Sequence, residues 1–497
     1  MTGSESDGGS RSGPEPGVTR DSGPARDPST GAERVDLVVE GGLVVTMDAA
    51  RRVLADATVA VRDGMVVAVG PSADLAGRFV AAERLDARRR VVVPGLVNAH
   101  LHVSTEPITR GVVPDDTSFE ENVFGWLSPL AAALGEEDER LSAQLGAAEC
   151  LRSGTTCFLD AGTGWHLDAV VDGLGEAGIR AQVGRRTWDR PATPEKFRQT
   201  TAQAVANLTD ALDRHGAGAA TDGRVRATAI LVGHTTCTDD LWRAARSLAD
   251  EHRVGLSFHM SPAPGDARQF LAETGERPVV HLDRLGVLGD DVVLVHGVHL
   301  DDEEVRLLGE RGCSVAHCPT TALKVAYGVS QVGRMPELVA AGANLCIGTD
   351  GANAANAADL YRAAYLVAGL WKDARRDPSV FPAAEVFAMA TRGGARALGL
   401  DHEIGSIEVG KRADLVLHDR DRPEWTPLHD VANQLVYSAD GRSVHTVLVD
   451  GRIVVDAGRL VTVDEERLYA AAEVAARRVL GRLGRRPVGR WPERGAP

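Results

Sequence analysis

Two hydrophobic patterns alternate along the chain. In residues 34–92, short apolar runs such as ATVAVRDGMVVAVG are divided by glycine and aspartate, and RDG at residues 62–64 has the composition of a hairpin turn. The same pattern returns after about residue 402, in GSIEVGKRADLVLHD and VHTVLVDGRIVVDAGRLV. We therefore expect residues 34–92 and 402–465, from the two ends of the chain, to form one composite β-sandwich domain.

The long segment between them, residues 93–401, consists of apolar runs separated by helical stretches, a pattern typical of βα units with a parallel sheet. TDDLWRAARSLADEHR is one such stretch, with Thr238 as its expected N-cap. Eight runs favour β-strands: VVVPGLVNAH, TTCFLDAG, RAQVGRRT, RVRATAILVG, VGLSFH, VVLVHG, CSVAHCP and ANLCIGTD. Because eight strands close a (β/α)8 barrel, the predicted fold class is α/β, a TIM barrel that carries the composite β-sandwich.

The two ends of the chain differ from both patterns. Residues 1–33 are rich in glycine, serine, proline and charge, so they bury too little apolar surface to offset the entropy of ordering, and we expect a disordered N-terminal arm. Residues 466–497 are predicted to form a C-terminal helix and tail. This helix is rich in arginine, which in an acidic chain favours a solvated face over a nucleic-acid contact.

Composition narrows the range of partners. The net charge is -15 at pH 7, whereas nucleic-acid binding draws on clustered positive charge, so we expect a small-molecule substrate and no nucleic acid. Neither a signal-peptide core nor a run of ~18 apolar residues is present, so we expect no membrane partner. The 6 cysteines form no CxxC pair, which favours reduced thiols and a cytoplasmic location.

Histidines collect where the predicted barrel strands end, the face on which such barrels carry their chemistry. The histidines at these ends are His100, His102, His234, His259, His296 and His317. Successive strand residues alternate faces, so the two histidines of NAHLH point the same way and can bind one ion. A lone histidine is usually just packed in a core, but several on one rim indicate a metal.

The candidate metal ligands are His100, His102, His259 and Asp350. Three nitrogens and one carboxylate that leave a position open describe a catalytic site for zinc or iron. The fourth strand, RATAILVG, offers no lysine or acid to bridge two ions, so we expect one divalent metal per chain, with zinc favoured and iron the alternative. Asp350 would also act as the base for a metal-bound water, and His296 would polarise the substrate or hold that water.

Six stretches, PGLVNAHLH, RSGTTCFLDAG, SFH, LVHGVHL, AHCPTTALKVAYGVSQVGRMPELVAAGANLCIGTDGANAANAADL and GSIEVGKRADLVLHD, resemble the amidohydrolase superfamily in order and spacing. The branch they resemble contains cytosine, guanine and adenosylhomocysteine-type deaminases and triazine chlorohydrolases. The likeness runs from about residue 35 to 460. It implies a barrel with an appended β-sandwich, metal ligands at the four positions above, a substrate-facing His296, and pocket histidines at His234 and His317. By the same resemblance, a homodimer is expected.

One position departs from that branch. The histidine of the fifth strand is usually followed three residues later by a glutamate that carries protons to the leaving group, but this chain has Pro262 there. Proline has no proton to give. The first hypothesis is a metal-dependent hydrolase that breaks a carbon–nitrogen bond of a small heterocyclic or amidine-like substrate, by deamination or ring opening. The alternatives are a metal-dependent cyclisation or elimination, and a non-catalytic relative that binds a ligand.

Other candidate substrate-binding residues lie in loops. Trp126 in FGWLSPL and Arg110 lie where a pocket is expected, although an aromatic residue near a loop more often serves packing. Asn353 lies in GANAAN, where the resembled branch often has adjacent serine and asparagine. This difference would lie at the same mouth of the barrel as Pro262, so we expect an unusual substrate.

Overall fold

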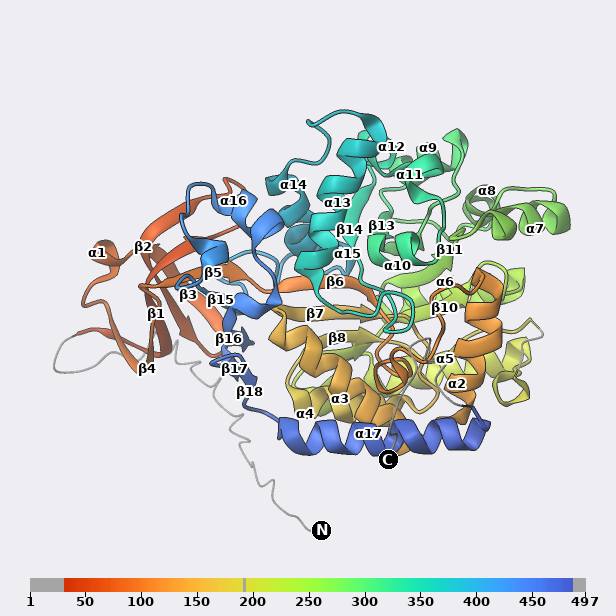
Figure 1. The fold of residues 1–497 in the computed structure, drawn as a ribbon, viewed down its shortest axis with the longest axis horizontal. Helices are drawn as coiled ribbons and strands as arrows, with labels where there is room; N and C mark the ends of the chain where they lie inside the picture. The colour runs from red at the N-terminus through yellow and green to blue at the C-terminus, as the bar shows by residue number, and fades with distance from the viewer. Residues whose placement is uncertain (1–30, 191–193, 486–497) are drawn as a thin grey trace, which may run out of the picture.

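The computed structural model of the chain describes residues 31–190 and 194–485. The predicted disordered arm therefore lies almost entirely outside the described residues, as does the last part of the predicted C-terminal tail. A β-sheet forms one end of the molecule, and parallel strands surrounded by helices form the rest (Figure 1).

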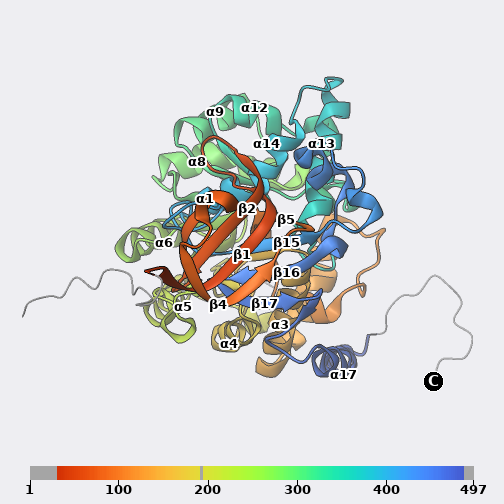
Figure 2. The ribbon, with the colours of Figure 1, turned by 90° about the vertical axis from the view of Figure 1, so that its left-hand side faces the viewer.

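Strands from the two ends of the chain form one nine-stranded sheet, in the order β18-β17-β16-β15-β5-β1-β2-β3 with β4 paired to β1 (Figure 2). The join is the antiparallel pair β5–β15, in which Leu415 faces Pro94. Asp63 and Gly64 between β2 and β3 both have positive φ, as a tight hairpin turn requires, which confirms the RDG turn. The strands are β1 (Glu33–Val45), β2 (Val53–Arg62), β3 (Met65–Pro71), β4 (Phe79–Asp86), β5 (Arg90–Pro94), β15 (Leu415–Asp419), β16 (Val444–Val449), β17 (Arg452–Asp456) and β18 (Arg459–Leu460).

Parallel strands make up two further sheets, ordered β6-β7-β8-β9 and β10-β11-β12-β13-β14. Each of the eight apolar runs overlaps at least one of these strands, and RVRATAILVG overlaps two, β9 and β10, so the strand predictions are confirmed. The strands are β6 (Leu96–Leu101), β7 (Thr155–Asp160), β8 (Arg180–Val183), β9 (Val225–Ala227), β10 (Ala229–Gly233), β11 (Leu256–Met260), β12 (Val292–His296), β13 (Ser314–His317) and β14 (Asn344–Ile347).

The first apolar run, VVVPGLVNAH, is shared between two sheets. Its first half is β5 of the nine-stranded sheet, and its second half is β6 of a parallel sheet. Gly95 lies at the crossing, where a Cβ atom would lie 1.9 Å from the Thr156 hydroxyl oxygen. A residue without a side chain is therefore required for the chain to pass from one sheet to the other.

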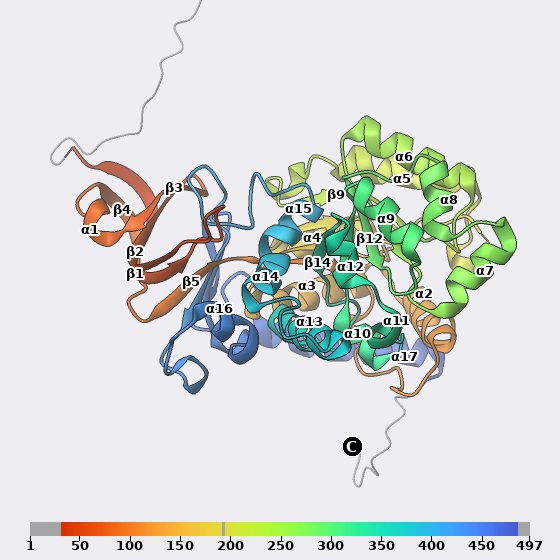
Figure 3. The same cartoon turned by 90° about the horizontal axis from the view of Figure 1, so that it is seen from above.

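Helices cover the parallel strands from outside (Figure 3). The longer ones are α3 (Glu136–Arg152), α4 (Leu167–Ala177), α5 (Thr201–His215), α6 (Asp239–His252), α13 (Leu360–Arg375) and α17 (Glu465–Leu483). The Thr238 side chain accepts a hydrogen bond from the Leu241 amide at 3.4 Å, which confirms the predicted N-cap of α6. The arginine-rich α17 lies along α3, where Arg482 donates to Asp138 at 2.7 Å. Within the described ranges, no helix is long and apolar enough to cross a bilayer.

A buried ion pair connects the nine-stranded sheet to the parallel strands. The Arg180 guanidinium at the start of β8 donates to both carboxylate oxygens of Asp414, at 2.9 and 3.1 Å, and both side chains are almost fully buried. Asp414 also accepts from the Asp450 amide at 2.7 Å. Because both charges are paired and hydrogen-bonded, this contact fixes the two parts of the molecule to each other.

His418 on β15 provides a prediction about pH. Its ring is fully buried, with Nε2 2.6 Å from the Tyr361 hydroxyl and Nδ1 2.9 Å from the Ser443 hydroxyl, and burial lowers its pKa to about 3. The unfolded chain has a histidine pKa of about 6.5, so between these values only the unfolded state takes up this proton. The free energy of unfolding should therefore fall as pH drops below about 6.5.

At pH 4.5 this one group should cost ~2–3 kcal/mol relative to pH 7. Urea unfolding of the chain and of His418→Asn at both pH values measures it, because the variant should lose less stability on acidification. His402→Asn, at an exposed histidine, is the matched control and should behave like the unchanged chain. Equal losses in the chain and in His418→Asn would contradict the assignment.

Candidate metal and catalytic site

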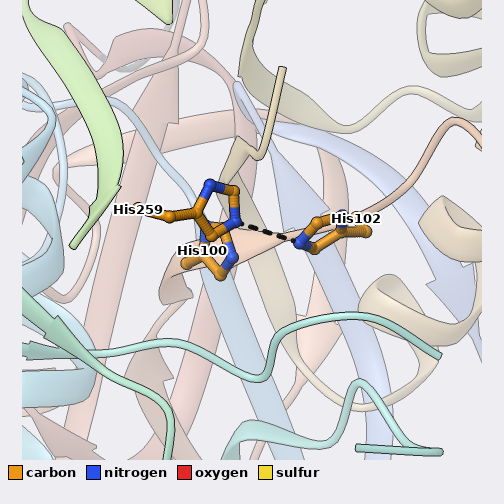
Figure 4. A group of neighbouring side chains, drawn as sticks. All are labelled: His100, His102 and His259. Atoms are coloured by element: carbon orange, nitrogen blue, oxygen red, sulfur yellow. Dashed lines mark hydrogen bonds between the residues drawn. The ribbon is translucent and has the colours of Figure 1, made fainter. Parts of the chain in front are cut away.

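The histidines and the aspartate predicted as metal ligands come together at the C-terminal ends of the parallel strands. His100 lies on β6, His102 directly follows that strand, His259 lies on β11, and Asp350 follows β14. Figure 4 shows the three imidazole rings, with the Nε2 atoms of His259 and His102 facing each other at 3.4 Å. Asp350 Oδ1 lies 3.1 Å from His102 Nε2 and 3.4 Å from His100 Nε2. One ligand atom from each of the three histidines lies within 4.8 Å of the others, a spacing that fits a single cation.

The chemistry of these groups also fits a metal. His100 is 1% exposed, and neither of its ring nitrogens has a hydrogen-bond partner in the described part of the chain. Burial lowers the pKa of His100 and of His259, so both are neutral, the form that binds a metal. Burial opposes ionisation of Asp350, but the His100 and His102 rings, within 3.4 Å of its Oδ1, outweigh this and hold its pKa well below the usual range. Burial opposes protonation of His102, but the Asp350 and Glu106 carboxylates outweigh this and raise its pKa to about 9, so His102 has to release a proton when it binds a metal. An ionised carboxylate beside imidazoles is a typical zinc ligand set.

The orientation of His259 is fixed by the backbone. Its Nδ1 donates to the Val232 carbonyl oxygen at 2.5 Å, which places the proton on Nδ1 and leaves the Nε2 lone pair directed at the cluster. Val232 lies on β10, which pairs in parallel with β11. Because the two strands end at the same edge, the Val232 carbonyl lies beside the His259 ring.

His296, at the end of β12, lies beside the cluster. Its Nε2 is 3.9 Å from Asp350 Oδ2, the carboxylate oxygen that does not face His100 and His102. Burial lowers the pKa of His296 to about 4, so the ring is neutral, and its Nδ1 is a buried atom without a hydrogen-bond partner among the described residues. The ring can therefore give or accept one hydrogen bond in the space over Asp350.

The backbone is strained at these strand ends. Ser261, His296 and Asp350 have φ values of 44°, 73° and 65°, in the left-handed region that side chains other than glycine rarely adopt. Such residues cost about 1–3 kcal/mol each and cluster where a side chain must be aimed for function. Two of the three carry the candidate catalytic side chains, which supports their assignment.

The two predicted pocket histidines, His234 and His317, are both buried. His234 Nδ1 is 3.4 Å from the carbonyl oxygen of His259, and burial lowers the pKa of His234 to about 4. His317 Nε2 accepts a hydrogen bond from the Trp371 indole at 3.1 Å, so this nitrogen is engaged by helix α13. A role of either ring in substrate binding stays a prediction.

The three loop residues predicted to bind substrate have different surroundings. Asn353 is fully buried and donates its amide N–H to Glu106 Oε2 at 2.7 Å. Arg110 forms an ion pair with Glu149, and Trp126 packs against the guanidinium of Arg485, whose central carbon is 4.4 Å from the ring centroid. The structure thus connects Asn353 to the cluster through Glu106, but it places Arg110 and Trp126 against other partners.

Two residues near the cluster were not expected from the sequence. Glu106, 3% exposed, has Oε1 3.4 Å from His102 Nδ1. Tyr327, 7% exposed, lies edge-on to the His296 ring with the centroids 5.7 Å apart. Glu106 is four residues after His102 in HLHVSTE, a position that the loop after the first strand brings back over the site. Tyr327 belongs to the long segment after β13 and carries no motif that would have identified it.

Comparison with known proteins finds relatives that match most of the chain. Residues 91–454 match the model of the amidohydrolase family. A 5-methylthioadenosine/S-adenosylhomocysteine deaminase of Syntrophobacter fumaroxidans is 34% identical over 449 residues, which cover 90% of this chain and 99% of the relative. A 5'-deoxyadenosine deaminase of Methanothermobacter thermautotrophicus is 35% identical, over 80% of this chain and 89% of the relative.

Solved structures are also similar to this chain over most of its length. A zinc-bound adenosine deaminase from Xanthomonas campestris superposes with a TM-score of 0.82 and 34% identity, covering 90% of this chain and 100% of the other. A zinc complex of atrazine chlorohydrolase from Arthrobacter aurescens TC1 has a TM-score of 0.80 at 24% identity, covering 88% of this chain and 100% of the other, which shows a shared fold.

Proposed function

The chain belongs to the amidohydrolase family, and from that premise we propose that it is a metal-dependent hydrolase that removes an amino group from a purine nucleoside or a related heterocycle. The observation that carries this proposal is the convergence of three histidine Nε2 atoms and one ionised aspartate at the ends of β6, β11 and β14. The named activities of relatives 34–37% identical over most of the chain support deamination of an adenine nucleoside altered at its 5' position.

We propose that His100, His102, His259 and Asp350 hold one zinc ion, with iron as the alternative. Zinc at such a site lowers the pKa of a water molecule to ~7 and so supplies a nucleophile at neutral pH. The two Asp350 oxygens are divided between two tasks. Oδ1 faces His100 and His102, whereas Oδ2 faces His296 and can accept a proton. Neutral His296 then holds the substrate atom that gains negative charge.

We also infer that the two parallel sheets close into one (β/α)8 barrel, which would bring all strand ends to one rim. The His100 carbonyl oxygen on β6 accepts from the Thr349 and Asp350 amides after β14, at 3.1 and 3.0 Å. The Asn98 side chain on β6 donates to the Thr349 hydroxyl at 2.7 Å and accepts from the Thr349 amide at 3.1 Å. At the other seam, only Thr228 separates β9 from β10.

Pro262 favours a second candidate, the hydrolytic opening of a cyclic amide. Pro262 is buried between β11 and helix α7 (Pro264–Thr274), and it offers no proton for a leaving amine. Near neutral pH, Tyr327 keeps its proton and Asp266 carries one for part of the time. Burial raises the pKa of Asp266 to about 6 and that of the Tyr327 hydroxyl well above its usual value. A ring-opening reaction keeps its leaving group tethered and depends less on a dedicated acid.

The test is zinc content together with ammonia release. The chain purified with zinc should bind one ion and release ammonia from 5'-methylthioadenosine or adenosine, with His102→Ala as the matched control that loses both. One zinc per chain with a ring-opened product, and no ammonia, would support the second candidate instead. Zinc with a cyclised or eliminated product, or a chain that binds ligand but no zinc, would overturn the proposal.

A further inference from the structure

We propose that Glu106 is a positioning residue that holds the imidazole of His102 in the one tautomer able to bind the metal. This inference rests on the proposed function, because it assigns a task to a carboxylate beside the same ligand set. The contacts of the Glu106 carboxylate are with His102 Nδ1 and the Asn353 backbone amide, so we assign it a task that is exerted through His102.

The two nitrogens of His102 face different partners. Nε2 faces the cluster, 3.4 Å from His259 Nε2 and 3.1 Å from Asp350 Oδ1, whereas Nδ1 lies 3.4 Å from Glu106 Oε1. A neutral imidazole carries one proton, and a carboxylate beside Nδ1 favours the proton there. Nε2 is then left with its lone pair directed at the metal position. His259 obtains the same result by donating Nδ1–H to a backbone carbonyl.

Glu106 is itself held in place. Its Oε2 accepts from the Asn353 amide at 2.7 Å, and Asn353 Nδ2 donates to the Thr109 hydroxyl at 3.0 Å. The carboxylate is 3% exposed and so has little freedom to turn away from His102. Its two oxygens thus face two different N–H donors, one from the His102 ring and one from the backbone.

Gly351 leaves the room that this carboxylate needs. A Cβ atom at position 351 would lie 2.2 Å from both carboxylate oxygens of Glu106 and 2.3 Å from its carboxyl carbon. Since real Cβ atoms never approach so closely, any side chain at 351 would displace Glu106. Gly351 directly follows Asp350, so the sequence TDG joins a metal ligand to the space for the carboxylate that orients another ligand.

Glutamine cannot replace this glutamate. A carboxamide has one acceptor oxygen, so if that oxygen serves the Asn353 amide, the NH2 group faces His102 Nδ1. The NH2 group would donate to Nδ1 and force the ring proton onto Nε2, where it blocks the metal. Glu106→Gln is therefore nearly isosteric but reverses the preferred tautomer.

The experiment is the zinc affinity of the full chain, measured by competition with a chelator. Glu106→Gln should weaken zinc binding by about 10- to 100-fold, the usual cost of losing a carboxylate that orients a metal-bound histidine. Nitrogen NMR of 15N-histidine-labelled apoprotein, recorded at a pH at which every ring is neutral, should show one ring moving from the Nδ1–H to the Nε2–H form. The matched control is Glu304→Gln, which alters a fully buried carboxylate on α9 (Asp302–Glu310) bound by Arg277, and it should leave zinc affinity unchanged.

A second pair of variants tests the same contact without removing the carboxylate. Gly351→Ala should weaken zinc binding in the unchanged chain but add no further loss in a Glu106→Ala background, where no carboxylate remains to be displaced. Unchanged zinc affinity in Glu106→Gln, or full additivity of Gly351→Ala and Glu106→Ala, would overturn the proposal. Failure of the unchanged chain to bind zinc would instead overturn the proposed function.

Discussion

Replacing Asp350 by asparagine should lower kcat/KM of the zinc-loaded enzyme by about 10³- to 10⁴-fold, the upper range for loss of a general base. Asparagine has the size of aspartate, but it carries no charge and takes up no proton. In the structure, one Asp350 oxygen lies within 3.4 Å of two imidazole nitrogens and the other faces His296, so the variant removes a ligand charge and the proton acceptor together. Ammonia release at saturating zinc, with zinc content measured on the same sample, checks the result.

The zinc content separates the two tasks of Asp350. A variant that retains zinc yet loses activity identifies the proton acceptor, whereas loss of both identifies mainly the ligand. Asp359→Asn is a matched control, because Asp359 caps helix α13 through the Tyr361 amide and asparagine is an equally good N-cap. Asp350→Asn with zinc bound and more than about a tenth of the activity would show that another group takes the proton.

The strands and the ligand cluster could be predicted from sequence because both depend on short-range patterns. A parallel strand buried on both faces is a continuous apolar run, and its last residue marks the edge where the chemistry lies. His259 and Asp350 each end such a run, so their convergence followed from the topology alone. The order of the strands was sufficient for this prediction, and the lengths of the segments between them were not needed.

Glu106 and Tyr327 could not be predicted in this way. Both belong to segments that leave a strand end and return over the site, and the path of such a loop is set by tertiary packing rather than by periodicity. Arg110 illustrates the same dependence on loop packing, and its role in substrate binding stays a prediction. It follows the same strand as Glu106, but its side chain turns outward to the ion pair with Glu149 on α3.

Pairing between distant segments could not be predicted from local sequence patterns either. The split of VVVPGLVNAH between two sheets depends on the contact of Gly95 with Thr156, which lies on β7. A single apolar run of ten residues gives no sign that its two halves belong to different sheets. The strained φ of His296 and Asp350 is similar, because surrounding packing imposes it against the local preference of both residues.

Pro262→Glu should raise deamination of adenine nucleosides by about 10²- to 10⁴-fold, the usual value of a positioned general acid or base. The position follows His259 by three residues on a buried turn, between a strand that carries a metal ligand and helix α7. Ser261, which precedes the proline, has φ 44°, a conformation that a following proline makes more crowded, so removing the proline should not strain the turn.

Pro262→Gln is the matched control, because glutamine has the shape of glutamate but no proton to transfer. A gain in ammonia release by Pro262→Glu and not by Pro262→Gln would show that the proline withholds acid catalysis and thereby selects substrates whose leaving group needs none. Equal activity of both variants and the unchanged chain, with zinc retained, would show that Asp266, Tyr327 or the substrate itself already supplies the proton. The proline would then be a feature of the turn alone, and ring opening would lose its main support.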